Sequence, residues 1–303
     1  MHILITGGTG FIGQAFINTF QGEHSFTVFS RDLDKANRLF KHIPADQIKF
    51  ISQLSKLEPG DHVDAVINLA GEPIMDKLWS ANQKHKLEAS RWETTQQLVD
   101  LINAQQISPK VLISGSAVGV YGRQGDKIVD ETHAISYPEY STELCQHWEQ
   151  IAHTASEHTR VVLIRTGIVL GKNGGALKKI QIPFKYGFGG RIGNGQQYMS
   201  WIHIDDMVAA INFILMRDTL NGPFNMTAPN PVKNKEFTQA MAARFNKKAW
   251  LHSPSLLLRL VLGERAELII YGQRVVPSRL IEAGFEYKFE SVEDALAAIY
   301  PPE

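Results

Sequence analysis

The chain has 303 residues and carries 31 basic and 31 acidic side chains, so its formal charge is zero. Nucleic-acid-binding domains usually have a clear excess of Lys and Arg, and this balance argues against nucleic acid as the main partner. The composition, with 44% hydrophobic and 20% charged residues, is that of a globular protein with a substantial core. At this length we expect one large α/β domain with a smaller second domain.

The N-terminal residues MHILITGG enter a strand at once and show neither the charged region nor the cleavage site of a secretory signal. The strongly apolar run at 255–263 is too short to span a bilayer and contains Arg259. We therefore expect a soluble cytoplasmic protein with no membrane partner. The single cysteine, Cys145, excludes an internal disulfide and a cysteine zinc cluster, and we expect a buried thiol and no metal site.

Apolar, β-branched runs alternate with amphipathic segments along the first half of the chain. Such strands, separated by helices, indicate a parallel sheet covered on both faces. We predict strands at His2–Thr6, Phe26–Ser30, Lys49–Ile51, Val63–Leu69, Lys110–Ser114 and Arg160–Arg165, and helices at 12–21, 32–41, 80–104 and 138–157. From about residue 166 the sequence becomes rich in glycine, which predicts a smaller C-terminal domain over 166–303, while the helical segment 203–217 is able to pack back on the first domain.

A glycine loop joins the first predicted strand to the first predicted helix. In GGTGFIG, residues 7–13, Gly7 and Gly10 allow a tight turn close to a pyrophosphate, and Gly13 allows the helix to lie against the strand. The N-terminus of that helix offers free N–H groups to the phosphates. Near Leu69, Ala70 and Gly71 the fourth strand ends where backbone must again pass close to a flat ligand.

The end of the second strand decides which dinucleotide is expected. An acidic residue there would accept from the ribose 2′-OH of NAD, whereas an arginine pairs with the 2′-phosphate of NADP. Ser30 and Arg31 stand at this end, and Asp32 follows in what resembles a helix N-cap. We therefore expect NADP(H), with NAD less favoured. The expected cofactor contacts are Gly7, Thr9, Gly10, Phe11, Ile12, Gly13, Ser30, Arg31, Leu69, Ala70 and Gly71.

Several motifs in order resemble the extended short-chain dehydrogenase/reductases. TGGTGFIG, LISGSAVGVYG at 112–122 and WIHIDDMV at 201–208 are similar to motifs of that superfamily. INLAGEPI, LIRTGIVLGKNGGAL, NMTAPNPVKNKEFT and GQRVVPSRLIEAGFEY resemble more narrowly a bacterial "epimerase family" subfamily with its own C-terminal segment at about 250–300. The resemblance implies an α/β fold with a Rossmann doubly wound parallel sheet over 1–165 that binds NADP(H), and a smaller α+β C-terminal substrate domain.

The stretch PEYSTELCQHWE at 138–149 departs from the superfamily pattern Tyr-x-x-x-Lys, because Leu144 stands where the lysine belongs. In that superfamily a serine polarises the substrate oxygen, a tyrosine exchanges the proton, and the lysine lowers the tyrosine pKa and holds the nicotinamide ribose. Ser116 and Tyr140 match the first two. A tyrosine near its usual pKa of about 10 accepts protons poorly without a nearby cation, so Glu143 and Glu72 are alternative acid/bases.

Other side chains are weaker candidates. His147 lies on the same broad helix face as Tyr140, and Tyr121 is placed either to contact a substrate or to pack under its loop. Arg165 and Arg191 are candidates to clamp an anionic substrate, and Arg191, Tyr198 and Trp201 are candidates to line its cleft. Trp201 and His203 are alternatively placed only to brace the return strand, and Asp205–Asp206 resembles a helix N-cap pair.

Two functions stay open at this point. The first is an NADP(H)-dependent enzyme that reduces or epimerises a small molecule, such as a nucleotide sugar, by hydride transfer. The second is a non-catalytic NADP(H)-binding protein that reports cofactor state to a partner. The missing lysine favours the second, and the polar, glycine-rich cleft segments favour the first. The apolar faces of 254–262 and 277–283 fit a core, a lid or a homodimer seam.

Overall fold

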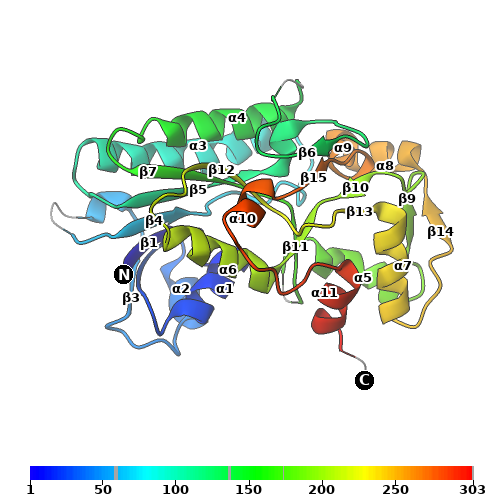
Figure 1. The fold of residues 1–303 in the computed structure, drawn as a ribbon, viewed down its shortest axis with the longest axis horizontal. Coiled ribbons are helices and arrows are strands. Elements are labelled where there is room, and N and C mark those ends of the chain that lie inside the picture. The colour runs from blue at the N-terminus through cyan, green and yellow to red at the C-terminus, as the bar shows by residue number, and fades with distance from the viewer. Residues whose placement is uncertain (58–60, 136–137, 173, 302–303) are drawn as a thin grey trace.

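A computed structural model describes residues 1–57, 61–135, 138–172 and 174–301. Seven strands form one sheet in the order β12-β7-β5-β4-β1-β2-β3, and every neighbouring pair is parallel (Figure 1). The strands are β1 (His2–Thr6), β2 (Ser25–Phe29), β3 (Ile48–Ile51), β4 (Ala65–Asn68), β5 (Val111–Ala117), β7 (Arg160–Thr166) and β12 (Gly222–Met226). The predicted doubly wound α/β fold is confirmed.

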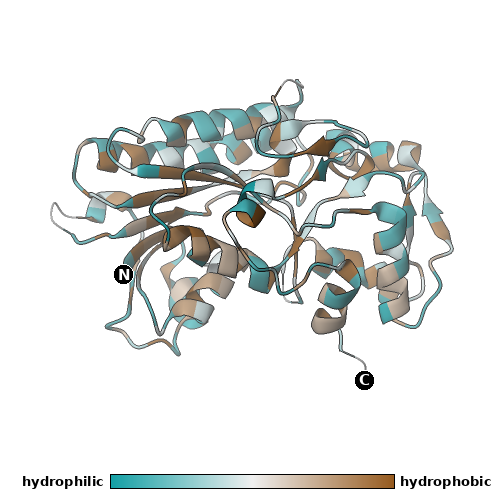
Figure 2. Cartoon of the chain, viewed as in Figure 1, coloured by the Kyte–Doolittle hydropathy of each residue, from teal (hydrophilic) through white to brown (hydrophobic). Residues whose placement is uncertain are grey.

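Helices cover both faces of this sheet, because the strands are apolar on both sides. Along β1, Ile3 and Ile5 face one core and Leu4 faces the other. The first core includes α1 (Phe11–Phe20) and α6 (Ile204–Leu215), with α2 (Leu33–Leu39) at the same side, and the second includes α3 (Ala81–Asn103) and α4 (Tyr140–His153). Figure 2 shows the apolar residues concentrated along the strands, whereas the outer surfaces of α3 and α4 are largely hydrophilic.

The sheet draws residues from both sides of position 166. Strand β12 pairs with β7, and α6, which corresponds to the expected helix at 203–217, packs against α1. Short elements connect the strands: η1 (Leu54–Lys56), η2 (Val118–Tyr121) and β6 (Ile128–Val129).

The remaining C-terminal elements surround a separate core that contains Trp201, Phe237, Phe289 and Leu296. Pairs of short strands frame it. They are β8 (Ile168–Leu170) with β11 (Trp201–His203), β9 (Gly190–Ile192) with β14 (Leu251–Ser253), and β10 (Tyr198–Met199) with β13 (Val232–Lys233). The helices are α5 (Leu177–Lys185), α7 (Asn234–Arg244) and α11 (Val292–Ile299).

Residues 255–282 return from this region to the large sheet domain. They form α8 (Ser255–Leu262), η3 (Gly263–Ala266), α9 (Glu267–Ile270), β15 (Arg274–Val275) and α10 (Ser278–Glu282). Glu264 pairs with Lys84 at 2.6 Å, and Arg265 donates to the Met75 carbonyl at 2.9 Å. The C-terminal segment is thereby joined to the loop that follows β4. No helix within the described ranges is long and apolar enough to cross a membrane.

Candidate cofactor and active site

The glycine loop has the conformation that its sequence predicts. Gly7 has φ +69°, and a Cβ there would lie 2.4 Å from the Leu69 carbonyl oxygen. A Cβ on Gly13 would lie 2.5 Å from the Gly7 oxygen, so only glycine permits this approach of helix to strand. The N-cap of α1 is Gly10, which is exposed and provides no side-chain cap. The first-turn N–H groups of α1 are therefore placed to bind an anion.

Phe11 lies beneath the second glycine-rich segment. A Cβ on Gly174 would lie 2.3 Å from the Phe11 ring, and one on Gly171 would lie 2.6 Å from it. The ring therefore packs against Gly171, Gly174 and Gly175, and the contact expected between Phe11 and a cofactor is left to its backbone. Neighbouring Thr9 is fixed by its carbonyl, which accepts from Gln14 Nε2 at 2.7 Å. Ile12 is half-buried and packs on the sheet core beneath α1.

At the end of β2, the two candidate ribose-binding side chains have different surroundings. Asp32 caps α2, with its Oδ1 accepting from the Lys35 N–H at 2.8 Å, as its position predicted. Ser30 is buried and donates to the Asp32 carbonyl at 3.0 Å. Arg31 is exposed and makes no ion pair with any side chain in the described part of the chain. The cation is thus open to a ligand, while the carboxylate is already used.

The end of β4 is tied to β1 and α3 by a buried asparagine. Asn68 accepts from Thr6 Oγ1 at 2.6 Å and donates to Thr95 Oγ1 at 2.7 Å. Leu69 and Ala70 then lie against Gly7, since a Cβ placed on Gly7 would meet the backbone atoms of both residues. This arrangement brings the two backbone segments expected to hold a dinucleotide side by side, at the point where the strand order reverses.

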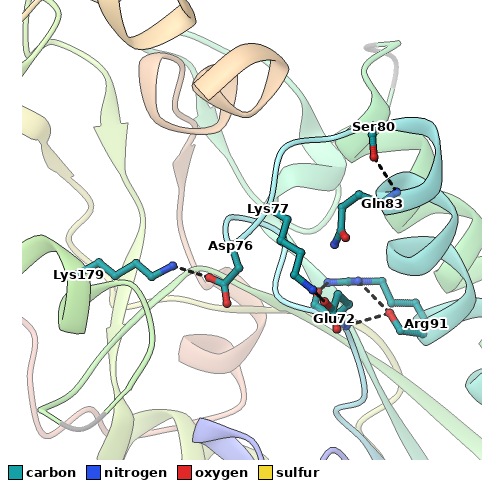
Figure 3. A network of polar contacts seen from close by, with 8 residues as sticks. Glu72, Asp76, Lys77, Ser80, Gln83, Arg91 and Lys179 are labelled. Atoms are coloured by element: carbon teal, nitrogen blue, oxygen red, sulfur yellow. Dashed lines mark hydrogen bonds and ion pairs between the residues drawn. The ribbon is translucent and has the colours of Figure 1, made fainter. Parts of the chain in front are cut away.

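Glu72 follows at the edge of this cradle (Figure 3). Its N–H donates to Ser90 Oγ at 2.9 Å, its carbonyl accepts from Arg91 at 3.1 Å, and its carboxylate pairs with Lys77 at 3.4 Å. The backbone of Glu72 is therefore fixed by α3. Its carboxylate is held by a single long contact to a mostly exposed lysine, so it remains available to a ligand.

Ser116 is part of a buried network that the sequence did not predict. Its hydroxyl donates to Glu149 Oε1 at 2.6 Å, and Arg165 binds both carboxylate oxygens of Glu149 at 2.9 and 2.8 Å. All three residues are buried. Burial opposes the charge of Arg165, but the hydrogen bonds and charge of Glu149 outweigh it and raise the Arg165 pKa above its ordinary value. Ser116 thus serves a carboxylate that is already paired.

Tyr121 belongs to the same network. Its hydroxyl donates to Asn225 Oδ1 at 2.8 Å and accepts from Arg165 Nη1 at 2.9 Å. Burial raises its pKa to about 12. Of the two alternatives for Tyr121, the geometry fits packing under the loop. Glu149 has a sequence signal in retrospect, since it is a charged residue on the same helix face as buried Cys145 and Trp148.

Tyr140 is the first residue of α4, and its side chain lies elsewhere. Its hydroxyl donates to the Lys84 carbonyl at 3.2 Å, and its ring lies 4.9 Å from Trp79, with Lys84 Nζ 4.7 Å above it. Burial, and then the charge of Glu88, raise the pKa of Tyr140. Ser116 and Tyr140 share no partner in these contacts. The structure therefore does not join them into the serine–tyrosine pair that the resemblance implied.

The register of α4 explains this separation. Among the residues of α4 that face β5 and η2 are Ser141, Cys145 and Glu149, spaced one turn apart. Burial raises the pKa of the Cys145 thiol to about 11. Tyr140 lies one residue away from this face, and Glu143 is exposed. The inward residues Ser141, Cys145 and Glu149, each four positions from the next, include no cation.

The remaining predicted residues divide between bracing and cleft positions. Trp201 is fully buried and donates to the Asn230 carbonyl at 3.1 Å. Asp205 and Asp206 were expected to cap α6. The N-cap is instead His203, and the two aspartates lie in the first turn of the helix. The Asp206 carboxylate accepts from the Lys288 and Phe289 N–H groups. His147 is exposed beside Trp92.

A cavity of about 500 Å³ lies between the loop after η2 and the C-terminal elements. Arg123, Gln197, Tyr271 and Gly272 are among its lining residues. Arg123 lies 3.8 Å from the Tyr271 ring centroid and pairs with Glu139 and Glu267. Tyr198 is next to Gln197 in the sequence, and Lys233 and Arg274 lie over its ring. Arg191 lines a separate cavity of about 290 Å³, which Trp250 also lines.

This geometry agrees with comparisons to known proteins. Residues 3–227 match the model of the NAD dependent epimerase/dehydratase family, and residues 253–299 match a domain of unknown function, DUF1731. The chain is 41% identical to the chloroplastic SDR39U1 homolog of Arabidopsis thaliana over 99% of its length and 86% of the relative. It is 34% identical to the epimerase family protein YfhF of Bacillus subtilis, covering 99% of this chain and 98% of that protein.

Solved structures give the same result. The human epimerase family protein SDR39U1, crystallised with NADPH, is 32% identical and has a TM-score of 0.90 over 99% of both chains. A nucleoside-diphosphate sugar epimerase from Corynebacterium glutamicum is 28% identical, with a TM-score of 0.76, and the match covers 99% of this chain and 58% of that one. From the glycine cradle, the sheet order and these similarities together, this chain belongs to the NAD dependent epimerase/dehydratase family.

Proposed function

We propose that this protein binds NADP(H), with the pyrophosphate over Gly7–Gly13 and the 2′-phosphate at Arg31. The observation that carries this proposal is the contrast at the end of β2, where Arg31 is exposed and Asp32 is used as a helix cap. A guanidinium binds a phosphate through charge-assisted hydrogen bonds, whereas a capping carboxylate has less capacity left for a ribose hydroxyl. The NADPH in the human relative supports the same choice of cofactor.

We further propose that the bound cofactor serves hydride transfer on a small molecule in the cavity lined by Arg123 and Tyr271. When bound, the nicotinamide supplies the hydride donor or acceptor. Glu72 is the proposed acid/base, because it follows Gly71 at the edge of the cradle and its carboxylate is held only by Lys77. Ser116 and Tyr140 are poorer candidates, since the first serves Glu149 and the pKa of the second is raised.

A nucleotide sugar is the proposed substrate class. The similarity to the Corynebacterium nucleoside-diphosphate sugar epimerase supports it. So does the lining of the cavity, which combines amide side chains, an aromatic ring and the backbone of Gly193 and Gly272. These groups suit the hydroxyls of a sugar and the face of its ring.

A second function, cofactor binding without catalysis, is favoured by one specific observation. Ser116 stands where the superfamily has the serine that polarises the substrate oxygen. Its hydroxyl already donates to a buried, charge-paired carboxylate. Freeing that hydroxyl would leave Glu149 with one hydrogen bond fewer in a buried site, which carries an energetic cost. A protein that only reports the state of its cofactor has no need of that hydroxyl.

Cofactor choice is tested by calorimetric titration of wild type, Arg31→Gln and Arg38→Gln with NADPH and NADH. Arg38 is an exposed arginine of α2, so its variant makes the same charge change outside the cradle. Loss of a charge-assisted contact worth roughly 1.5–3 kcal/mol predicts an approximately 10- to 100-fold weaker NADPH affinity for Arg31→Gln. NADH affinity should be unchanged in both variants. Failure of the wild type to bind either dinucleotide would refute the proposal.

Catalysis is tested by incubating the NADP⁺-loaded and NADPH-loaded protein with a panel of nucleoside-diphosphate sugars, with product analysis by mass spectrometry and NMR. If turnover occurs, Glu72→Gln should abolish it, while Ser116→Ala and Tyr140→Phe should retain it. Turnover that depends on Tyr140 and not on Glu72 would show that the acid/base assignment is wrong. Absence of turnover across the panel, with tight NADPH binding, supports the non-catalytic function.

A further inference from the structure

Arg91 of α3 points its guanidinium at the backbone that ends β4 (Figure 3). Nη2 donates to the Glu72 carbonyl at 3.1 Å, and Nη1 donates to the Leu87 carbonyl at 3.0 Å. A Cβ on Gly71 would lie only 3.1 Å from the guanidinium carbon. Gly71 itself is exposed. The cation therefore lies directly behind the glycine where we expect a cofactor to pass.

Arg91 makes no ion pair in the part of the chain that the structure describes, although the charge of Glu72 acts on it. Its hydrogen bonds go to two carbonyls and, at 3.5 Å, to Ser90 Oγ. The carboxylate of adjacent Glu72 pairs with Lys77 instead. Below the guanidinium lies the Trp148 ring, with its centroid 5.4 Å away. An arginine has five N–H donors, so two of them find no acceptor among the described residues.

A half-buried guanidinium of this kind is unlike the other arginine at the sheet end. Arg165 has both oxygens of Glu149 as partners, and their charge offsets the cost of burial. Arg91 has only neutral acceptors, and burial lowers its pKa below the ordinary value. A half-buried cation that has only neutral hydrogen-bond acceptors is stabilised when an anion binds beside it.

The location of Arg91 selects one half of the dinucleotide. Arg31 follows β2 on one side of β1, while Gly71 and Arg91 lie on the other side, next to β4 and β5. A dinucleotide lies across this point of strand-order reversal, with its adenosine 2′-position at the end of β2. The nicotinamide half therefore extends toward Arg91. The charge of Arg91 also acts on Cys145, which is next to Leu144 where the lysine is absent, and on Tyr140.

We propose that Arg91 binds the nicotinamide half of NADP(H), through its phosphate and ribose oxygens, and so replaces the lysine absent from α4. The inference rests on the proposed NADP(H) binding. Arg91 is separated from Leu144 by more than fifty positions in the chain, so no motif at 138–149 reveals it. Arg91 approaches from α3, a different helix from the one that carries the superfamily lysine.

The test measures dissociation constants by calorimetry for three ligands: NADPH, adenosine 2′,5′-bisphosphate and reduced nicotinamide mononucleotide. The variants are Arg91→Gln, Arg91→Lys, Arg31→Gln and a matched control, Lys86→Gln. Lys86 is an exposed cation of α3, so its variant makes the same charge change without touching the cradle. Thermal unfolding of each variant without ligand reports whether the fold is intact.

We expect Arg91→Gln to weaken NADPH and nicotinamide mononucleotide binding by about tenfold or more, as for loss of one charge-assisted contact, and to leave the bisphosphate within about twofold. Arg31→Gln should show the converse, with the bisphosphate weakened. Arg91→Lys should recover part of the loss, and Lys86→Gln should match wild type.

Two results would overturn the inference while leaving NADP(H) binding in place. One is an NADPH affinity of Arg91→Gln equal to that of wild type. The other is an equal loss for all three ligands that Arg91→Lys does not restore, which would mean that Arg91 only supports the fold. If the wild type does not bind NADPH at all, the proposed function fails together with this inference, and the wild-type titration alone identifies that case.

Discussion

The two ends of the parallel sheet differ in how their polar groups are used. Around β1, β2 and β4, the cradle has exposed glycine backbone, an exposed Arg31 and an Arg91 with only neutral partners. Around β5 and β7, by contrast, Ser116, Glu149 and Arg165 satisfy one another in a buried network. Groups left without partners inside a fold are positions for a ligand, whereas groups that satisfy one another stabilise the fold. The cofactor end is thus open and the expected catalytic end is closed.

The largest expected effect tests whether the closed end is structural. Glu149→Gln removes the charge that compensates buried Arg165 and should destabilise the protein by about 3 kcal/mol. Urea unfolding without nucleotide measures the change. Glu143→Gln, an exposed carboxylate of the same helix, is the control and should stay within about 0.5 kcal/mol of wild type. A loss of stability no larger than that of the control variant would show that this network does not stabilise this end of the sheet.

Thiol chemistry probes the same end. Burial raises the pKa of Cys145 from 9.0 to about 11, so at pH 8 the native protein should hold about a hundredfold less thiolate than an ordinary cysteine. Reaction with a disulfide reagent should be slow until the protein unfolds. The unfolded chain loses the Cys145 proton at a lower pH than the native protein does. The free energy of unfolding therefore falls as the pH rises from about 9 toward 11. Rapid labelling of native protein at pH 8 would show an open end.

The open end is tested by filling its tightest glycine. Gly7→Ala combines a positive φ with a contact 2.4 Å from the Leu69 carbonyl, which should cost about 2 kcal/mol and abolish the NADPH-induced rise in melting temperature. Gly22→Ala is the matched control, because a Cβ there meets no atom within 4 Å. If Gly7→Ala still shows the full NADPH shift, the backbone of this loop does not hold the pyrophosphate.

The smallest expected effect concerns Tyr140. Tyr140→Phe removes one hydrogen bond to the Lys84 carbonyl and should lower stability by about 0.5–1.5 kcal/mol. NADPH affinity, measured by the same calorimetric titration, should remain within about twofold of wild type. A loss of turnover of tenfold or more without a stability change would place Tyr140 among the catalytic residues and would break the contrast between the two ends.

The cofactor end was predictable because its determinants are local. The GGTGFIG loop needs Gly7 and Gly13 for backbone geometry within a few residues, and Arg31 and Asp32 stand at fixed positions after a strand. The predicted strands of the sheet were also found, with bounds shifted by up to three residues. The return of β12 to the sheet has no local signal, because strand pairing between residues 160–166 and 222–226 joins distant segments.

The sequence by itself therefore determined the fold class, the glycine cradle and the absence of a lysine at Leu144. Only the tertiary structure decided what the polar side chains do. Ser116 finds Glu149, Arg165 completes that pair, and Tyr140 turns toward α3, because the rotation of α4 places Ser141, Cys145 and Glu149 inward. The physical reason is that hydrogen-bond partners are chosen by packing of elements far apart in the chain, and a one-residue difference along a helix turns a side chain by about 100°.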